Sequence, residues 1–238
     1  LHINTMTEIL LQHLVEKTDK YPLTQEDIIR ISTASALHDI GKISIPDEII
    51  NKSGRLTKEE FEIMKTHSAV GASMLSAITA YQNEPFMKTA YEICRWHHER
   101  YDGKGYPDGL KGDEIPISAQ IVSLADVYDA LTSERCYKKA FSHETAINMI
   151  MNGECGAFNP LLLDCLLEVA GDIQRELAVN SPEREFQVHE TVEQILKHKK
   201  LHGYGYSINQ MRIEQAKKEF FFEHERTLVF DYSELTNV

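Results

Sequence analysis

Six histidines and aspartates between residues 38 and 126 have the types and positions expected of metal ligands. Adjacent residues on a helix point about 100° apart, so a His-Asp pair at a helix end can offer one metal cluster both a nitrogen and an oxygen. A carboxylate inside an otherwise apolar stretch, as in residues 121–127, needs a partner because an unpaired buried charge is costly. Each residue alone could be a satisfied core or surface residue, but the whole set favours a metal site. The six residues are His38, Asp39, His67, His97, His98 and Asp126.

The donor types of this set indicate which metals and which reaction to expect. Mixed imidazole and carboxylate ligands suit iron, manganese or zinc. Magnesium and calcium prefer sites in which all ligands are oxygen atoms. Two such metals about 3.5–4 Å apart can hold a bridging hydroxide and a phosphate oxygen together. Water bound in this way is acidic enough to attack phosphorus near neutral pH. The residues therefore predict metal-assisted hydrolysis of a phosphodiester.

The composition limits the substrate and the setting. The 238 residues carry a formal net charge of −12. Because a protein needs many lysines and arginines to displace the counterions of a nucleic acid, no nucleic acid polymer is expected as a partner, whereas a few local cations could still bind a small anion. No run approaches the ~20 apolar residues of a membrane span, and no signal peptide is visible. The four cysteines show no pairing pattern, which favours reduced, buried thiols in a cytoplasmic protein.

Capping residues mark the helices that must carry the ligands. After each capping residue, apolar residues recur at the spacing of one face of a helix. The proline after Asn159 suits the first position of a helix that runs to about residue 177. Together with helices expected at residues 3–16 and 87–97, the pattern predicts an all-α fold. The predicted caps are Thr24, Thr57, Ser118, Ser142 and Asn159.

The chain divides into three parts, and one long loop stands out in the first. Residues 102–116 are too long for a simple turn and directly follow the His-His pair, and ordered loops beside polar clusters are often functional. We expect one domain over residues 1–178 and a helical extension or linker over residues 179–225. Residues 226–238 are expected to form a terminal strand, either an edge strand or the first strand of a further domain. Because the residues after Leu1 already look helical, we expect a truncated N-terminus.

Several motifs in the first 175 residues occur together in one known family. The most specific is the block at residues 97–107, His-His-Glu-Arg-Tyr-Asp-Gly-Lys-Gly-Tyr-Pro. The others are His-Asp-Ile-Gly-Lys at residues 38–42, His67, Ala-Asp-Val-Tyr-Asp-Ala-Leu-Thr at residues 125–132, Arg135, and Tyr137 with Lys138. In this combination the chain resembles the HD-GYP family, a branch of the HD metal-dependent phosphohydrolases.

The resemblance implies an HD-domain helical bundle with an ordered GYP loop. It also implies hydrolysis of cyclic di-GMP to linear pGpG or GMP through a metal-bridging hydroxide. The six residues named above would be the metal ligands, with Asp39 as the bridging carboxylate. Lys42 would be the active-site lysine, which binds the substrate and stabilises charge on the phosphoryl oxygens. Arg135 and Lys138 match positions that contact the substrate, and Tyr106 is expected at the rim of its pocket.

The number of metals stays open. His2 matches the family's early histidine ligand, which helps to complete a third metal site in some members. Its usual companion, a glutamate one turn earlier, would precede Leu1. Two or three divalent ions are therefore expected, iron or manganese first, with zinc, nickel or magnesium as alternatives. The sequence departs from the family at Thr5, where arginine is common, and at Asn159, where aspartate is usual, although asparagine can also cap a helix.

Two other functions stay open alongside a cyclic di-GMP phosphodiesterase. One is an HD-superfamily phosphohydrolase that acts on another nucleotide. The other is a non-catalytic module that senses cyclic di-GMP. The unbroken set of ligands and the presence of Arg135 and Lys138 favour an active enzyme. A homodimer and a regulatory domain on either side of this chain are further expectations from the family.

Overall fold

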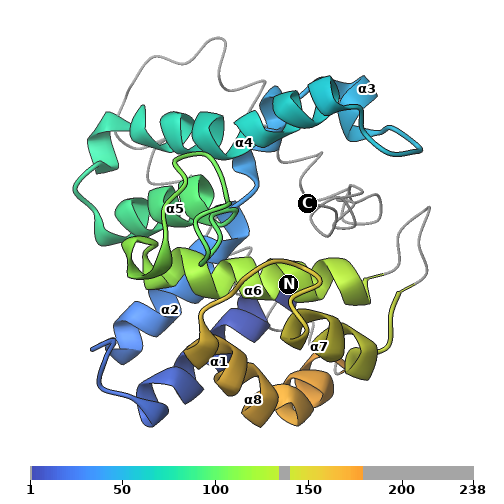
Figure 1. Ribbon diagram of the computed structural model, residues 1–238. Helices are drawn as coiled ribbons and strands as arrows, with labels where there is room; N and C mark the ends of the chain where they lie inside the picture. The colour runs from blue at the N-terminus through green and yellow to red at the C-terminus, as the bar shows by residue number, and fades with distance from the viewer. Residues whose placement is uncertain (1, 134–139, 179–238) are drawn as a thin grey trace.

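The computed structural model describes residues 2–133 and 140–178, and in these residues the chain is helical with no strand. The all-α prediction is confirmed. The predicted extension and terminal strand, which follow residue 178, lie outside the described residues. The α-helices of the described part are α1 (His2–Lys17), α2 (Gln25–Ala34), α3 (Asp47–Ile50), α4 (Lys58–Ser76), α5 (Pro85–Trp96), α6 (Ile117–Thr132), α7 (His143–Met151) and α8 (Pro160–Ala178) (Figure 1).

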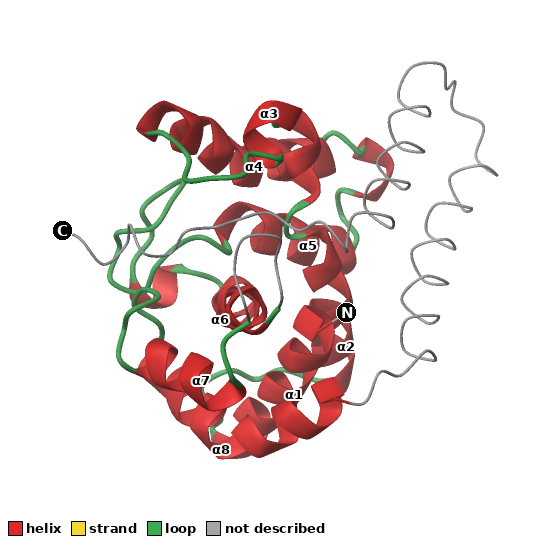
Figure 2. Ribbon diagram, turned by 90° about the vertical axis from the view of Figure 1, so that its right-hand side faces the viewer, coloured by secondary structure: helices red, strands yellow, loops and turns green. Residues whose placement is uncertain are grey.

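Helix α6 is the central element of the fold. Figure 2 looks almost along its axis and shows α1, α2, α5, α7 and α8 arranged around it. Apolar residues occupy every side of this helix, and Ile121, Leu124 and Leu131 are at most 1% exposed. A helix that is apolar all round is stable only when other helices cover it. A charged side chain on α6 therefore projects into the interior of the protein.

Four of the five predicted caps are confirmed. Thr24 and Thr57 each form a capping box with the acidic residue three positions on. Ser142 Oγ accepts the amide N–H of Thr145 at 3.2 Å at the start of α7. Asn159 Oδ1 accepts the amide N–H of Leu161 at 3.0 Å at the start of α8. These side chains satisfy donors that the first turn of a helix leaves free.

The prediction that Ser118 caps α6 is wrong. The helix begins at Ile117, directly after Pro116, and Ser118 lies in its first turn. Ser118 is 3% exposed, and its Oγ donates to Glu92 Oε2 of α5 at 2.9 Å. The side chain therefore joins two helices instead of capping one, because it faces the neighbouring helix.

The helix that Thr24 caps ends before the His-Asp pair, although apolar spacing continues to Leu37. α2 ends at Ala34, and two 3₁₀ turns follow, η1 (Ser35–Leu37) and η2 (Ile40–Ser44). The Ser35 hydroxyl donates to the carbonyl oxygen of Ser32 at 2.6 Å. Such local bonds from a serine side chain compete with regular helix formation. The chain consequently turns just before the His-Asp pair.

Three of the four cysteines are described. Cys94, Cys155 and Cys165 are buried free thiols, which confirms the prediction for them, and Cys136 lies outside the described residues. Within residues 2–133 and 140–178, no helix has both the length and the apolar character needed to span a membrane.

Candidate metal centre

Gly41 brings the His38-Asp39 pair against helix α4. A Cβ atom at Gly41 would clash with the carbonyl oxygen of His67 and would lie 2.6 Å from the amide nitrogen of Gly71. Only glycine allows the turn η2 to approach the helix backbone this closely. The approach leaves Asp39 Oδ1 3.3 Å from His67 Nε2. Gly41 thus sets the distance between the first two parts of the site.

The C-terminal end of α5 supplies the next two side chains. The amide N–H of His97 closes the helix on the carbonyl oxygen of Ile93 at 3.0 Å, and its ring is 1% exposed. His97 Nε2 lies 3.5 Å from His67 Nε2, and the ring centroids of His97 and His98 are 4.0 Å apart. Ligand atoms of four residues lie within 4.8 Å of one another, from Asp39, His67, His97 and His98.

His38 and Asp126 complete the group. His38 Nε2 lies 3.1 Å from Asp39 Oδ2 and 3.7 Å from Asp126 Oδ1. Asp126 belongs to the central helix α6, whose burial directs the carboxylate inward. The structure therefore brings together all six residues that the sequence singles out as metal ligands. We call this group the His/Asp cluster; its members are His38, Asp39, His67, His97, His98 and Asp126.

The backbone fixes which nitrogen of each ring faces the centre. The Nδ1 atoms of His38, His67 and His97 each lie 2.7–3.0 Å from a carbonyl oxygen three or four positions earlier in the chain. A carbonyl oxygen only accepts, so each Nδ1 carries a proton and donates it. In a neutral ring Nε2 then presents a lone pair, and this is the usual form of a histidine that binds a metal.

Burial keeps most of these rings neutral. It lowers the pKa of His67 to about 4 and lowers the pKa values of His97 and His98 well below the usual range. His38 differs: although burial opposes it, the nearby carboxylates, Asp39 first, raise the pKa of His38 to about 9. A cation bound at Nε2 would replace the proton that His38 otherwise holds there.

Among these side chains, Asp39 is the one best suited to bind a cation. Its Oδ2 accepts a hydrogen bond from Lys42 Nζ at 2.6 Å, and the positive charges of Lys42 and His38 hold the pKa of Asp39 well below its usual range in spite of burial. Its Oδ1 is buried and accepts no hydrogen bond from any residue that the structure describes. This oxygen faces the neutral Nε2 atoms of His67 and His97. An unsatisfied carboxylate oxygen beside converging imidazole lone pairs fits a divalent metal ion.

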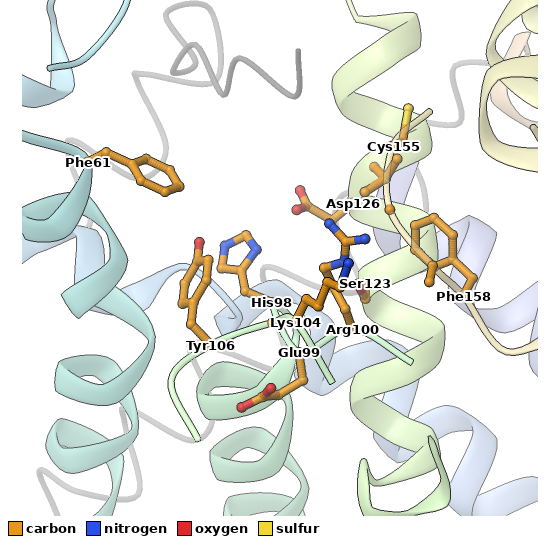
Figure 3. Close-up of a pocket in the computed structure, with 14 residues that line it drawn as sticks. Phe61, His98, Glu99, Arg100, Lys104, Tyr106, Ser123, Asp126, Cys155 and Phe158 are labelled. Carbon is orange, nitrogen blue, oxygen red and sulfur yellow. The ribbon is translucent and has the colours of Figure 1, made fainter. Parts of the chain in front are cut away.

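A pocket opens beside the cluster (Figure 3). It is bounded by the loop after His98, by α6 and by residues 155–158. Tyr106 stacks on His98 with ring centroids 4.8 Å apart, and Phe61 of α4 meets the Tyr106 ring edge-on at 6.4 Å. Tyr106 therefore lies at the pocket beside the cluster. Phe61 was not predicted as a site residue, because its sequence context marks it only as an apolar helix position.

Three other predicted site residues are not members of the His/Asp cluster, and the structure describes one of them. His2 does not belong to the four residues whose ligand atoms lie within 4.8 Å of one another. Its Nδ1 donates to Asp129 Oδ1 at 3.0 Å. The same carboxylate oxygen accepts the hydroxyl of Ser133 at 3.2 Å. Arg135 and Lys138 lie outside the described residues, so their placement at the site stays a prediction.

Several proteins named as cyclic dinucleotide phosphodiesterases are similar to this chain. It is 43% identical over 164 residues to a probable cyclic di-GMP phosphodiesterase of Vibrio cholerae. The aligned region covers 67% of this chain and 37% of that protein. It is 42% identical over 153 residues to the cyclic di-GMP phosphodiesterase response regulator RpfG of Xanthomonas campestris, covering 64% of this chain and 39% of the regulator. It is 40% identical over 148 residues to a 3'3'-cGAMP-specific phosphodiesterase of V. cholerae, covering 62% and 28%. The chain thus spans less than half the length of these relatives.

The fold also has a solved counterpart. The crystal structure of the V. cholerae cyclic GMP-AMP phosphodiesterase V-cGAP3 matches with a TM-score of 0.53 and 17% identity, covering 79% of this chain and 48% of that one. At this identity the match speaks for the fold alone. A family model described as "HD domain" matches residues 2–158. The relatives and this match confirm the resemblance to HD-GYP proteins, and the chain belongs to the HD domain family.

Proposed function

We propose that this chain is a metal-dependent phosphodiesterase that hydrolyses cyclic di-GMP to linear pGpG or GMP. The observation that carries the proposal is the His/Asp cluster, in which a buried Asp39 oxygen faces the Nε2 atoms of His67 and His97 and accepts no hydrogen bond within residues 2–133 and 140–178. Divalent metals bound there would supply an acidic water and positive charge for the phosphate oxygens. The names of the cyclic di-GMP relatives support the choice of substrate.

The cluster would hold two or three metal ions, with Asp39 as the shared carboxylate. Mixed imidazole and carboxylate donors favour iron or manganese, and zinc, nickel or magnesium are alternatives. His2 is the candidate for a third site. Its Nδ1 donates to Asp129, which would leave Nε2 to act as a ligand, and a carboxylate behind a histidine is the usual support for one that binds a metal.

Other residues would act on the substrate. Lys42 is 16% exposed and paired with Asp39, so its ammonium group lies where it can neutralise a phosphate next to the cluster. The Tyr106 hydroxyl is buried and has no hydrogen-bond partner among the described residues, which suits contact with a bound ligand. Arg135 and Lys138 are proposed to bind the second phosphate and the guanines.

Replacing Asp39 tests this proposal. We expect Asp39→Ala to reduce hydrolysis of cyclic di-GMP by at least about a thousandfold, because the shared ligand is lost. Asp172→Ala, at an exposed position of α8, is the matched control and should keep full activity. Metal content is measured on each purified protein. Full turnover by metal-free Asp39→Ala protein would exclude the metal mechanism.

A panel of substrates separates the two enzymatic alternatives. Because one similar protein is specific for 3'3'-cGAMP, the wild-type protein should be assayed with cyclic di-GMP, 3'3'-cGAMP and cyclic di-AMP. We expect the highest kcat/KM for cyclic di-GMP. A preference for 3'3'-cGAMP would move the substrate assignment to that dinucleotide, and tight binding without turnover would favour a sensor module. A homodimer, a flanking regulatory domain and a cytoplasmic location remain predictions.

A further inference from the structure

Glu99 follows directly after the cluster residue His98, and its side chain holds the loop that comes next. The residue is 4% exposed. Its Oε1 accepts the amide N–H of Asp108 at 2.7 Å and that of Gly109 at 3.0 Å. Charge-assisted bonds of this kind are stronger than bonds between neutral groups. They hold Asp108 and Gly109 next to Glu99, so the segment between Glu99 and Asp108 is closed into a compact loop.

Two further features tighten this closure. The Asp108 side chain accepts hydrogen bonds from Arg95 Nε and Nη2, both at 2.8 Å, and from Trp96 Nε1 at 2.7 Å. Inside the loop, a Cβ atom at Gly105 would clash with Glu99 Cα and would lie 2.6 Å from the carbonyl carbon of Glu99. The loop backbone thus packs directly on the backbone of Glu99, and helix α5 anchors its far end.

Tyr106 is the side chain that this loop presents to the site. Its amide N–H donates to the carbonyl oxygen of His98 at 3.2 Å, and its ring stacks on the His98 ring at an interplanar angle of 28°. Figure 3 shows the Tyr106 ring beside His98, with its hydroxyl directed toward Phe61, while the Glu99 carboxylate points away from both rings. The Glu99 carboxylate is therefore used to hold the segment that carries Tyr106, although the residue itself belongs to the pocket wall.

We propose that Glu99 is a positioning residue for phosphodiester hydrolysis, holding residues 105–109 so that Tyr106 lies against His98. The inference rests on the proposed function of the site. A displacement of about 1 Å at a reacting centre can reduce a rate by about a hundredfold, so a loop fixed by one buried carboxylate is a sensitive point.

The experiment compares Glu99 with Glu92, a glutamate of helix α5 whose carboxylate accepts the Ser118 hydroxyl of α6. In Glu99→Ala we expect kcat for cyclic di-GMP to fall about tenfold to a hundredfold with unchanged metal content. Glu99→Gln should stay within about threefold of the wild type, because its amide oxygen can still accept both N–H groups. Glu92→Ala should keep the wild-type kcat. Hydrogen exchange should speed up at the amides of residues 106–110 in Glu99→Ala and not in Glu92→Ala.

A double-mutant cycle with Tyr106 distinguishes positioning from general destabilisation. If Glu99 acts through Tyr106, then Glu99→Ala added to Tyr106→Ala lowers kcat little further. Multiplicative effects of the two substitutions would overturn the inference, and so would unchanged amide exchange in Glu99→Ala. If Glu99→Ala does not fold, Glu99→Asp replaces it, since the shorter side chain keeps the charge but loses its reach to the loop.

The outcomes also separate this inference from the proposed function. A wild-type protein that hydrolyses no cyclic dinucleotide would contradict the proposed function. It would also overturn the role of Glu99, because there would be no reaction for which Glu99 positions the loop. A wild-type protein that hydrolyses cyclic di-GMP, with a Glu99→Ala variant of equal kcat, would overturn the role of Glu99 alone.

Discussion

Two buried polar groups in this protein differ in how fully the protein satisfies them. The first surrounds Asn159, whose Nδ2 donates to Gln120 Oε1 at 2.9 Å and to the Tyr21 hydroxyl at 3.1 Å. Its Oδ1 accepts the amide N–H of Leu161, and Gln120 Nε2 donates to the carbonyl oxygen of Ile115 at 2.7 Å. Every side-chain amide of Asn159 and Gln120 therefore has a protein partner. We call these three side chains, Tyr21, Gln120 and Asn159, the Asn159 network.

The His/Asp cluster, in which His67 and His97 are almost fully buried, is not closed in this way. In the described part of the chain, nothing donates a hydrogen bond to Asp39 Oδ1. The Nε2 atoms of His67 and His97 lie 3.5 Å apart, and neutral rings protonated at Nδ1 have no proton to share there. Burial of polar groups normally requires a partner for each. The comparison therefore assigns the Asn159 network to stability and the His/Asp cluster to a ligand, and the following predictions test that division.

Among substitutions that change no ligand, the largest effect is expected from Gly41→Ala. The new methyl group would meet the backbone of His67 and Gly71, so the turn η2 must move away from α4 and carry Asp39 with it. We expect metal content to fall and hydrolysis to drop by at least about a hundredfold. Gly54→Ala is the control, since nothing lies within 4 Å of a Cβ atom there. Normal metal binding by Gly41→Ala would show that the cluster tolerates a wider spacing.

Acid should destabilise the metal-free protein through the cluster. The pKa of His67 is lowered to about 4 by burial, while an unfolded histidine titrates near 6.5. Between these values the unfolded chain binds a proton that the folded chain does not, so the free energy of unfolding falls as pH falls from about 6.5 to about 4. His97 and His98 act in the same direction. Burial raises the pKa of Asp126, which offsets part of the loss.

Urea unfolding of chelator-treated protein at about pH 7 and about pH 4.5 measures this effect. The shift at His67 alone corresponds to a loss of roughly 3 kcal/mol. His67→Leu should weaken the pH dependence, whereas Asn159→Ala should not, because asparagine and glutamine do not titrate. Equal stability of the wild type at both pH values would contradict the assignment of neutral histidines to the cluster.

Asn159→Ala should affect stability and leave the metal site intact. The change removes a cap of α8 and leaves Gln120 Oε1 without its donor, which should cost about 2 kcal/mol of unfolding free energy. Metal content and turnover per folded molecule should equal those of the wild type. Asn159→Asp should also be destabilising in this chain, because a carboxylate cannot donate to Gln120. A loss of metal from either variant would mean that the two buried groups are coupled.

The two groups also differ in how far the sequence could predict them. All six members of the His/Asp cluster stand out by type and by motif, because a metal restricts which side chains can serve. For Asn159 the sequence predicts the cap, which depends only on neighbours along the chain. Its bonds to Tyr21 and Gln120 join residues far apart in sequence, and no local pattern marks them.

The same limit applies to helix ends and to the loop after His98. The caps at Thr24 and Thr57 were predictable because both partners lie within three residues. Ser118 has the type of a cap, yet a tertiary partner, Glu92, takes its hydroxyl. The sequence predicts that the loop is functional but indicates no role for Glu99. The bonds of Glu99 to the amides of Asp108 and Gly109 form only when the loop folds back on residue 99.

The smallest effect is expected from the capping box of α4, the helix that carries His67 about three turns further on. Thr57→Ala removes the acceptor for the amide N–H of Glu60 and should cost about 1 kcal/mol, measured by urea unfolding. Thr24→Ala makes the same change in α2 and should cost a similar amount. Both variants should bind metal as the wild type does, because the first turn of a helix can fray while Gly41 and Gly71 still hold its middle against η2. If Thr57→Ala alone weakened metal binding more than about tenfold, stability and site could no longer be treated as separate properties of this helix.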